Sequence, residues 1–375
     1  MKLNLFGGFL KQKADSVLGI DIGSSSIKVV QISKKGSQAV LDTYGELSLG
    51  PYGNVSVGRS VRLSPEKIAE ALTALITEKE VGIKAKVAGI AVPFESSLMT
   101  TFSIPESASK ELDAVVPLEA RKYIPVPISE VTIDWSIVPS HKESTTDDIV
   151  KTEVPHPKIE KEIEVLLVAI HNDILQAYKQ IATDSKLDVR FFEIEIFSTL
   201  RAIVDNEGAP VMIIDMGATN TKVYILERGV VRASHTINFG AQDITQAIAT
   251  GLNMPFEEAE VLKRDIGLGQ TTSGTDIAKM VEVPLGRIFS QANRIMFNFV
   301  KRYNTPLKQV LLVGGGSAIK GIDAYATNML KTETVMANPF SKLNTPAFID
   351  DVLARTGPEF VVAVGLALRA LREVS

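Results

Sequence analysis

The chain contains no cysteine, which excludes disulfide bonds, thiolate metal sites, iron–sulfur clusters and cysteine nucleophiles. Long hydrophobic runs are also absent, because the longest, 165–170 and 360–368, fall far short of the roughly 20 residues that a membrane-spanning helix needs. Basic residues are not in excess: 40 Lys and Arg stand against 44 Asp and Glu, for a net charge of −4. A nucleic-acid-binding protein needs a basic surface, so this balance argues against that class.

Several common site motifs are missing as well. The four histidines are scattered without the spacing of metal ligands. No Gly-Lys pair occurs, so there is no P-loop, and Ile319 stands where a dinucleotide-binding fingerprint starting at Gly314 would need its third glycine. Residues 1–13 carry a short apolar patch but no signal-peptide cleavage site, so we expect an uncleaved, cytoplasmic protein without nucleic-acid partners.

An internal repeat organises the chain. Residues 17–33 align without gaps on residues 211–227, and six of the 17 positions are identical. Each copy is an apolar run, an Asp-x-Gly turn with small residues, and a second apolar run, which predicts strand, turn and strand. The chain is long enough for two or three domains of about 150 residues. We therefore predict two similar α/β domains, the first enlarged by an insertion, because 194 residues separate Asp21 from Asp215.

Local patterns predict further elements. Strands over 86–92, 98–104, 131–138 and 163–170 are among those expected between the repeats. We assign these strands to the insertion, together with a helix over 107–124 that is bent near Pro117. The polar stretch 140–161 is predicted to be a mobile loop. A long amphipathic helix around 285–303 and a last, largely apolar helix over 358–372 complete the α/β pattern.

The two repeated turns have the chemistry of phosphate-binding loops. Glycine allows a tight turn, and the small residues after it let backbone N–H groups approach an anion. The aspartate in each copy, Asp21 or Asp215, is suited to hold Mg²⁺ through water. The turn residues predicted to bind the cofactor are Gly23, Ser24, Ser25, Ser26 and Lys28 in the first copy and Asp215, Gly217, Ala218, Thr219, Asn220 and Lys222 in the second. The alternative for each copy alone is a plain hairpin turn.

A third motif follows the second repeat. The apolar run 310–313 ends in Gly314, Gly315, Gly316 and Ser317. A backbone without side chains lets a flat purine and its ribose lie against it. By itself, such a glycine run is equally consistent with a simple turn.

Two phosphate turns followed by a glycine loop, in this order, resemble the actin-like ATPase superfamily. The resemblance implies two duplicated ribonuclease-H-like domains with ATP and magnesium between them. Glu260, Lys263 and Arg264 look like the Glu-x-x-Lys-Arg helix that contacts ribose and adenine in related heat-shock ATPases, and the alternative is a solvated helix face. Glu195 resembles the element that positions the attacking water, so it is the catalytic candidate together with Asp21; the alternative is a capping or surface glutamate.

Two further motifs are more specific. Residues 119–131, EARKYIPVPISEV, and 357–369, GPEFVVAVGLALR, resemble the family of the type IV pilus assembly protein PilM, and the likeness covers about 18–369. This family is similar in turn to the division protein FtsA, whose first domain carries an inserted subdomain called 1C. The implied domains are a first domain at 1–84 and 168–204 joined by the C-terminal helix 358–375, a 1C-like insertion at 85–167, and a second domain at 205–357.

The resemblance also implies a function. We expect an ATP-binding scaffold at the inner face of the cytoplasmic membrane, in the assembly platform of a type IV pilus or a related type II secretion machine, with any ATP hydrolysis slow. The main expected partner is the cytoplasmic N-terminal peptide of the membrane protein PilN. Other platform proteins, the assembly ATPase and further copies of the chain are also expected partners, and membrane association is expected through partners.

Two other functions remain as alternatives. An FtsA-like division filament is disfavoured because the sequence ends three residues after Arg372, without the amphipathic helix of FtsA. A sugar or acetate kinase of the same fold is disfavoured because no acceptor pocket or base is recognisable.

The partner peptide is expected in a groove between the insertion and the first domain, near Tyr123, Ile124 and Pro125, where it could pair with a strand edge. The alternative is that Tyr123 and Ile124 simply pack into the core. Residues 1–13 place apolar side chains between lysines, so contact with an anionic membrane is a further hypothesis, with an ordered or protein-bound tail as its alternative.

Overall fold

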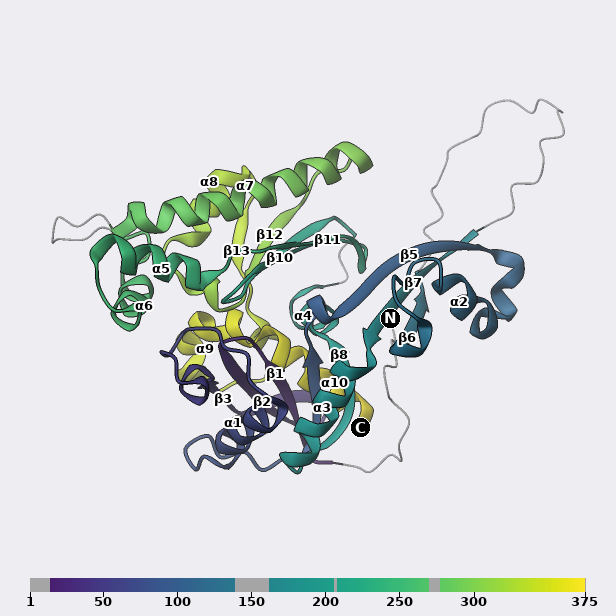
Figure 1. Ribbon diagram of the computed structural model, residues 1–375, viewed down its shortest axis with the longest axis horizontal. Coiled ribbons are helices and arrows are strands. Elements are labelled where there is room, and N and C mark those ends of the chain that lie inside the picture. Colours follow the sequence, from purple (N-terminus) through teal and green to yellow (C-terminus); the bar gives the residue numbers. More distant parts are fainter. Residues whose placement is uncertain (1–13, 139–161, 206–207, 270–276, 375) are drawn as a thin grey trace. The chain divides into compact units, whose positions relative to one another are not determined.

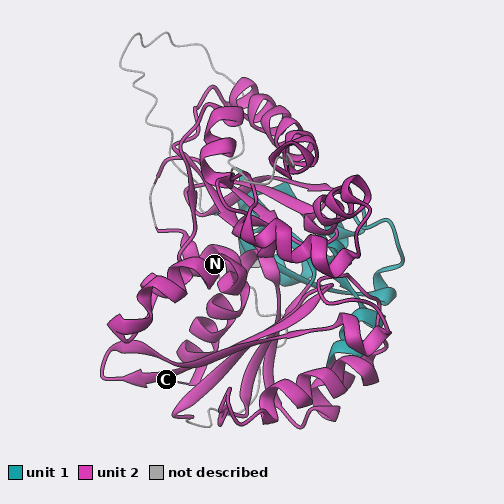
Figure 2. Cartoon of the chain, turned by 90° about the vertical axis from the view of Figure 1, so that its left-hand side faces the viewer, with its two compact units in different colours: residues 1–7, 93–178 teal, residues 8–92, 179–375 magenta. Residues whose placement is uncertain are grey.

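The computed structural model describes residues 14–138, 162–205, 208–269 and 277–374 (Figure 1). The predicted membrane-contacting segment 1–13 and the predicted loop 140–161 lie outside these residues. The chain divides into two compact units (Figure 2). The smaller unit contains Pro93–Tyr178, and the larger one contains Gly8–Val92 and Lys179–Ser375.

The larger unit contains two five-stranded sheets with the same strand order. The first sheet is β3 (Gln38–Ser48), β2 (Ser26–Lys35), β1 (Ser16–Ile22), β4 (Val87–Val92) and β8 (Asp188–Ile194). The second is β11 (Val230–Ile237), β10 (Thr221–Glu227), β9 (Val211–Met216), β12 (Gln309–Val313) and β13 (Thr334–Met336). In each sheet three antiparallel strands are followed by two that join in parallel. The predicted α/β duplication is confirmed.

The two repeats share their register as well as their order. Asp21 on β1 pairs with Lys28 on β2, and Asp215 on β9 pairs with Lys222 on β10. Both connecting turns close with an equivalent hydrogen bond. Gly23 N donates to the Ser26 carbonyl oxygen at 3.0 Å, and Gly217 N donates to the Asn220 carbonyl oxygen at 2.9 Å. Each repeat therefore places one carboxylate and one lysine side by side at the end of a hairpin.

A buried helix packs on the first sheet. Helix α10 (Val361–Val374) contacts β1, β4 and α4 (Glu195–Ile203) and is buried on nearly every side, as predicted for its apolar sequence. Its close approach depends on glycine: a Cβ on Gly19 of β1 would collide with the Ala363 carbonyl oxygen. Helix α1 (Pro65–Thr77) packs against β3, and α9 (Asp350–Thr356) precedes the 3₁₀ turn η8 (Gly357–Phe360) that leads into α10.

The second sheet is covered by α5 (Ala241–Leu252), α6 (Phe256–Asp265), α7 (Ile277–Tyr303) and α8 (Ile322–Leu330). Figure 1 shows α7 and α8 lying over the strands β10 to β13. Helix α7 begins well before the predicted start near 285, because the apolar spacing continues back through Val281 and Ile277, which are both buried.

The smaller unit is an antiparallel sheet with a helix on one face. Its strand order is β5 (Ser97–Pro105), β7 (Glu162–His171) and β6 (Val131–Ile137). Helix α2 (Leu112–Ala120) buries Val116 in a core with Phe102 and Leu167. This helix is shorter than the predicted 107–124, since a 3₁₀ turn (Glu106–Lys110) precedes it, and Pro117 lies inside it. Helix α3 (Asn172–Asp184) follows β7.

The predicted membership of one strand was wrong. We assigned residues 86–92 to the insertion, but β4 pairs in parallel with β1 and β8 in the first sheet of the larger unit. Five of its six residues are buried, so this strand needs neighbours on both edges and cover on both faces, which a central parallel position provides. No helix in the described part of the chain has the length and apolar character to cross a bilayer.

Candidate functional site

The two repeats bring their aspartates into one electrostatic neighbourhood. Asp21 and Asp215 each stand one residue before the end of their strand. Burial raises the pKa of Asp21 to about 7, although Lys28 opposes the rise, and Glu195 adds to it. Burial likewise raises the pKa of Asp215, against the opposing charge of Lys222. The residue Asp21 is half-buried as a whole, and it is the burial of its carboxyl group that raises the pKa.

A buried ion pair links the second repeat to α4. Lys222 Nζ donates to Glu195 Oε1 at 2.6 Å, and the two side chains are only 13% and 11% exposed. Burial alone would lower the pKa of Lys222, but Glu195 and Asp215 outweigh it and raise that pKa. Glu195 is the first residue of α4, at the predicted strand-to-helix turn. In the first repeat Lys28 pairs with Glu46 of β3 instead, at 3.1 Å.

The glycine loop lies directly against the second aspartate. Gly314 has a φ of +83°, and a Cβ there would come within 2.5 Å of Asp215 Oδ1, so only glycine fits. A Cβ on Gly316 would meet the Met216 side chain at 2.8 Å. Gly315 differs, because a Cβ there would have no neighbour closer than Glu359 Oε2 at 3.6 Å. The loop thus combines two glycines packed tightly beside β9 with one, Gly315, where an added Cβ would meet only an ordinary contact with Glu359.

Two of the three predicted site residues on α6, Glu260 and Lys263, form a buried cluster. Lys263 Nζ donates to Glu260 Oε2 at 2.7 Å and to Thr245 Oγ1 at 2.9 Å, and Arg264 Nε donates to Glu260 Oε1 at 2.9 Å. Glu260 is 8% exposed and Lys263 is 4% exposed. The alternative of a solvated helix face is therefore wrong for these two residues, and only the Arg264 side chain, 54% exposed, reaches solvent.

The remaining turn residues are tied to neighbouring segments. The carbonyl oxygens of Ser24 and Ser25 accept hydrogen bonds from Val61 N at 3.0 Å and Leu49 N at 2.8 Å. The Ala218 carbonyl oxygen accepts one from Gln242 N at 3.0 Å. The other predicted members, Ser26, Gly217, Thr219, Asn220 and Ser317, are buried or half-buried.

Two acidic residues of this region escaped the sequence analysis. Burial raises the pKa of Glu359, against the opposing charge of Lys28, and the same carboxyl group faces Gly315. Glu46 is held by Lys28, and the pKa of Glu46 is lowered because Lys28 and its hydrogen bonds outweigh burial. Glu359 stands in the motif 357–369, which could have drawn attention to it, whereas Glu46 carries no local signal.

The predicted peptide-contact residues lie in the smaller unit, just after α2. Tyr123 is 40% exposed and its ring stacks on Phe102, with centroids 5.1 Å apart and planes 10° apart. Pro125 is exposed. Ile124 is 7% exposed and belongs to the core of this unit, so the packing alternative holds for that side chain.

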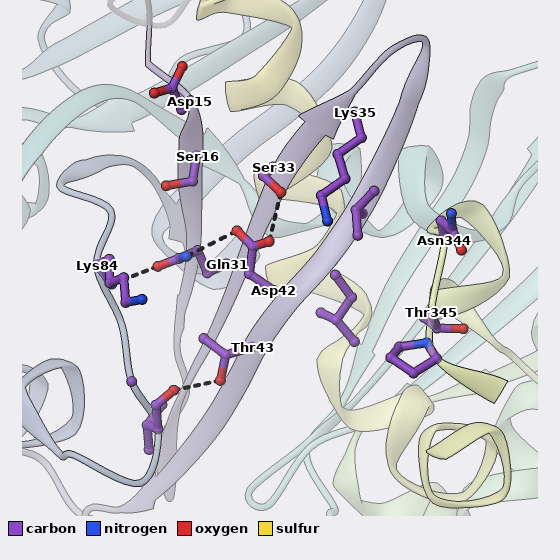
Figure 3. A pocket seen from close by; sticks show the side chains of 15 residues that line it. Asp15, Ser16, Gln31, Ser33, Lys35, Asp42, Thr43, Lys84, Asn344 and Thr345 are labelled. Atoms are coloured by element: carbon purple, nitrogen blue, oxygen red, sulfur yellow. Dashed lines mark hydrogen bonds between the residues drawn. The ribbon is translucent and has the colours of Figure 1, made fainter. Parts of the chain in front are cut away.

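A separate groove of about 800 Å³ lies at the opposite end of β1 from Asp21 (Figure 3). Its polar side chains largely satisfy one another: Gln31 Nε2 and Ser33 Oγ donate to Asp42 at 3.0 and 2.7 Å, and Thr43 Oγ1 donates to the Val81 carbonyl oxygen at 2.6 Å. None of the predicted site residues lines this groove.

Two repeated sheets of this order, with paired Asp–Lys hairpins, define the actin-like ATPase fold. Solved structures with the same fold include ethanolamine utilization protein EutJ from Carboxydothermus hydrogenoformans, at 16% identity over 96% of this chain and 91% of that one, with a TM-score of 0.54. MreB5 of Spiroplasma citri bound to AMPPNP has 13% identity over 94% and 95% of the two chains, with a TM-score of 0.50.

The particular family is more closely defined. The family model of the type IV pilus assembly protein PilM matches residues 19–371, and the chain belongs to this family. The structure is similar to that of a PilM-PilN type IV pilus biogenesis complex, with a TM-score of 0.75 and 22% identity over 96% of this chain and 99% of that one.

Curated relatives point to the neighbouring division family. The FtsA protein of Bacillus subtilis is 20% identical over 280 residues, which cover 68% of this chain and 60% of that protein. FtsA of Agrobacterium fabrum is 26% identical over 196 residues, 46% of this chain and 43% of that protein. The chain thus spans about half of the length of these relatives.

Proposed function

We propose that the chain binds Mg·ATP where its two repeats meet and serves as a nucleotide-binding scaffold of a type IV pilus assembly platform. The observation that carries this proposal is the shared register of the two Asp–Lys hairpins, with Gly314 packed against Asp215. Two carboxylates and two lysines converge on one place, which suits a metal-bound polyphosphate.

The residues present fit such a cofactor. Asp21 and Asp215 would hold Mg²⁺ through water, Lys28 and Lys222 would balance phosphate charge, and Gly315, where a Cβ would meet only Glu359, would border the nucleoside. Mg²⁺ usually takes one or two carboxylates and fills its remaining positions with water and phosphate oxygens. When bound, Mg²⁺ would neutralise phosphate charge.

Gly315→Val tests the nucleotide site. An added Cβ at Gly315 would meet only Glu359, in ordinary van der Waals contact, so we expect the variant to fold, and its melting temperature without nucleotide is measured first. Mg·ATP at 100 times its Kd should stabilise the wild type by about 2.7 kcal/mol and the variant far less. Asp215→Ala is the second variant, and it should also lose this response. Equal stabilisation of all three proteins by Mg·ATP would contradict the proposal.

We also propose that the smaller unit binds the N-terminal cytoplasmic peptide of a PilN-like membrane protein. Support comes from the PilM-PilN complex, to which this structure is similar, and from the exposed Tyr123 and Pro125. Strands β5 and β6 are the edges of the three-stranded sheet, and an extended peptide can add to such an edge.

Location and wider partners follow from the same proposal. Binding to a membrane-anchored peptide would hold the chain at the inner face of the cytoplasmic membrane. Other platform proteins, the assembly ATPase and further copies of the chain are the remaining proposed partners. In this arrangement the two sheets of the larger unit act as the two actin-like domains, with the smaller unit as the 1C-like insertion.

A further inference from the structure

A loop that follows the first sheet's hairpin forms hydrogen bonds with helix α5, which packs on the second sheet. Residues 58–61, which we call the strap, lie between the 3₁₀ turn η1 (Gly50–Gly53) and α1. Ser60 Oγ donates to Gln242 Oε1 on α5 at 3.0 Å, and Ser60 N donates to the same oxygen at 3.3 Å. Arg59 Nη2 donates to Gln246 Oε1 at 3.3 Å, and the Arg59 guanidinium lies 4.1 Å from the centroid of the Phe256 ring.

The strap is bonded directly to the first predicted phosphate turn and is linked to the second through Gln242. At one end, Val61 N donates to the carbonyl oxygen of Ser24 in the first turn at 3.0 Å. At the other, Gln242, which accepts from Ser60, donates its own backbone N–H to the carbonyl oxygen of Ala218 in the second turn at 3.0 Å. A chain of three hydrogen bonds therefore runs from one turn to the other through the strap and Gln242.

A third contact joins the strap to the charged cluster of α6. Gly58 has a φ of +86°, and a Cβ there would lie 3.2 Å from Glu260 Cγ. Glu260 is the residue that holds Lys263, Thr245 and Arg264. The backbone of the strap thus lies directly beside the carboxylate around which this cluster is built.

We propose that the strap is a positioning element for the nucleotide: it sets the distance between the two phosphate turns, and bound Mg·ATP in turn holds it closed. This inference rests on the proposed function. The strap makes few contacts with α5 and its residues are only half-buried, so it can open at a small free-energy cost, whereas a polyphosphate held by both turns stabilises the closed arrangement. Closure of the strap and binding of Mg·ATP must then favour each other by the same free energy.

The first test removes the strap's hydrogen bonds. Gln242→Ala and Ser60→Ala should each raise the Kd for Mg·ATP roughly fivefold to tenfold, as expected for ordinary coupling between sites. The double variant should be no weaker than the worse single variant, because the two side chains share one bond. Ser60→Thr keeps the hydroxyl group and should restore the affinity. An unchanged Kd in Gln242→Ala would overturn the proposal.

Glycine substitutions distinguish the effect of disturbing the strap from the effect of backbone strain alone. Gly58→Ala would press on Glu260, whereas Gly229→Ala is the matched control, with a φ of +78° and nothing within 4 Å of the added Cβ. Both variants place an alanine at a positive φ, but only Gly58→Ala disturbs the strap. Only Gly58→Ala should therefore weaken Mg·ATP binding. Equal Kd values for the two variants would also overturn the proposal.

Crosslinking reports closure directly. The chain has no cysteine, so Arg59→Cys with Gln246→Cys gives a unique pair and leaves the bond between Ser60 and Gln242 in place. A short bis-maleimide should join this pair several times faster with Mg·ATP than without it, and equal rates would count against nucleotide-driven closure. If wild type binds Mg·ATP and Gly315→Val does not, while the strap variants bind normally, the proposed function holds and the strap proposal fails. If wild type shows no binding, the proposed function itself fails.

Discussion

Lys222 and Glu195 lie 27 positions apart in the sequence and form an ion pair of 2.6 Å between β10 and the first turn of α4. The lysine belongs to a predicted phosphate turn, and the glutamate is the residue predicted to position water. Each therefore satisfies the charge of the other in this structure.

Lys222→Met should destabilise the protein by about 3 kcal/mol, because it removes the positive charge that faces the buried Glu195 carboxylate. Adding Glu195→Gln should recover part of this loss, since one of the carboxylates that Lys222 faces is then neutral. Urea unfolding measures both effects. The control is Lys67→Met, which breaks the exposed pair of Lys67 with Glu70 at 3.0 Å and should change stability by less than about 1 kcal/mol. Similar losses in both lysine variants would contradict the prediction.

Asp21→Asn should stabilise the metal-free protein at high pH. The folded-state pKa of Asp21, about 7, lies above the unfolded value of 3.8, so the folded protein binds the extra proton. Stability from this group is full below pH 3.8 and is lost as pH rises to about 7. Above pH 7 the variant should therefore exceed the wild type by up to about 4 kcal/mol. Unfolding curves in EDTA from pH 5 to 8 would refute this if the difference between the two proteins did not grow with pH.

Arg369→Met should weaken the protein at neutral pH and reduce the acid-dependent part of its stability. Glu193 accepts from Arg369 at 2.8 Å, from Arg201 at 2.6 Å and from Ser198 at 2.5 Å. Burial would raise the pKa of Glu193, but Arg201 and Arg369 outweigh it and lower that pKa.

A carboxyl group of lowered pKa contributes stability at neutral pH that is lost as pH falls below its unfolded pKa. With one arginine removed, the folded-state pKa of Glu193 rises towards its unfolded value, so less stability from this group is lost in acid, while stability at pH 7 should fall by about 3 kcal/mol. Arg372→Met, on the exposed side of the same helix, is the control, and identical acid unfolding of the two variants would disprove the assignment.

Tyr123→Ala should weaken binding of a PilN-like N-terminal peptide by about tenfold, because it removes an exposed aromatic side chain from the proposed surface. Trp135, the only tryptophan of the chain, lies on the edge strand β6 and reports binding through its fluorescence. Tyr303→Ala, which is 37% exposed on α7, is the control and should bind the peptide normally. Chemical-shift changes on adding the peptide that were confined to residues 205–355 would show that the peptide binds elsewhere.

Local sequence was sufficient for the repeated elements. Apolar runs that end in Asp-x-Gly predict a strand and a turn wherever they occur, because strand alternation and turn conformation depend on neighbouring residues. Two copies of one pattern then implied two similar sheets, and the order of Asp21, Asp215 and Gly314 indicated the actin-like fold. The strand over 86–92 shows the limit, since its pattern predicted a strand but not the sheet to which it belongs.

The sequence by itself determined the duplicated strand–turn–strand units, the glycine loop and the family, because these depend on residues that are adjacent or regularly spaced. Only the tertiary structure decided which charges meet. It paired Lys222 with Glu195, buried Lys263 against Glu260, placed Glu359 beside Gly315 and linked the strap to both phosphate turns by hydrogen bonds. Such pairs form between distant segments through burial and charge compensation, for which the local pattern of a chain carries no signal.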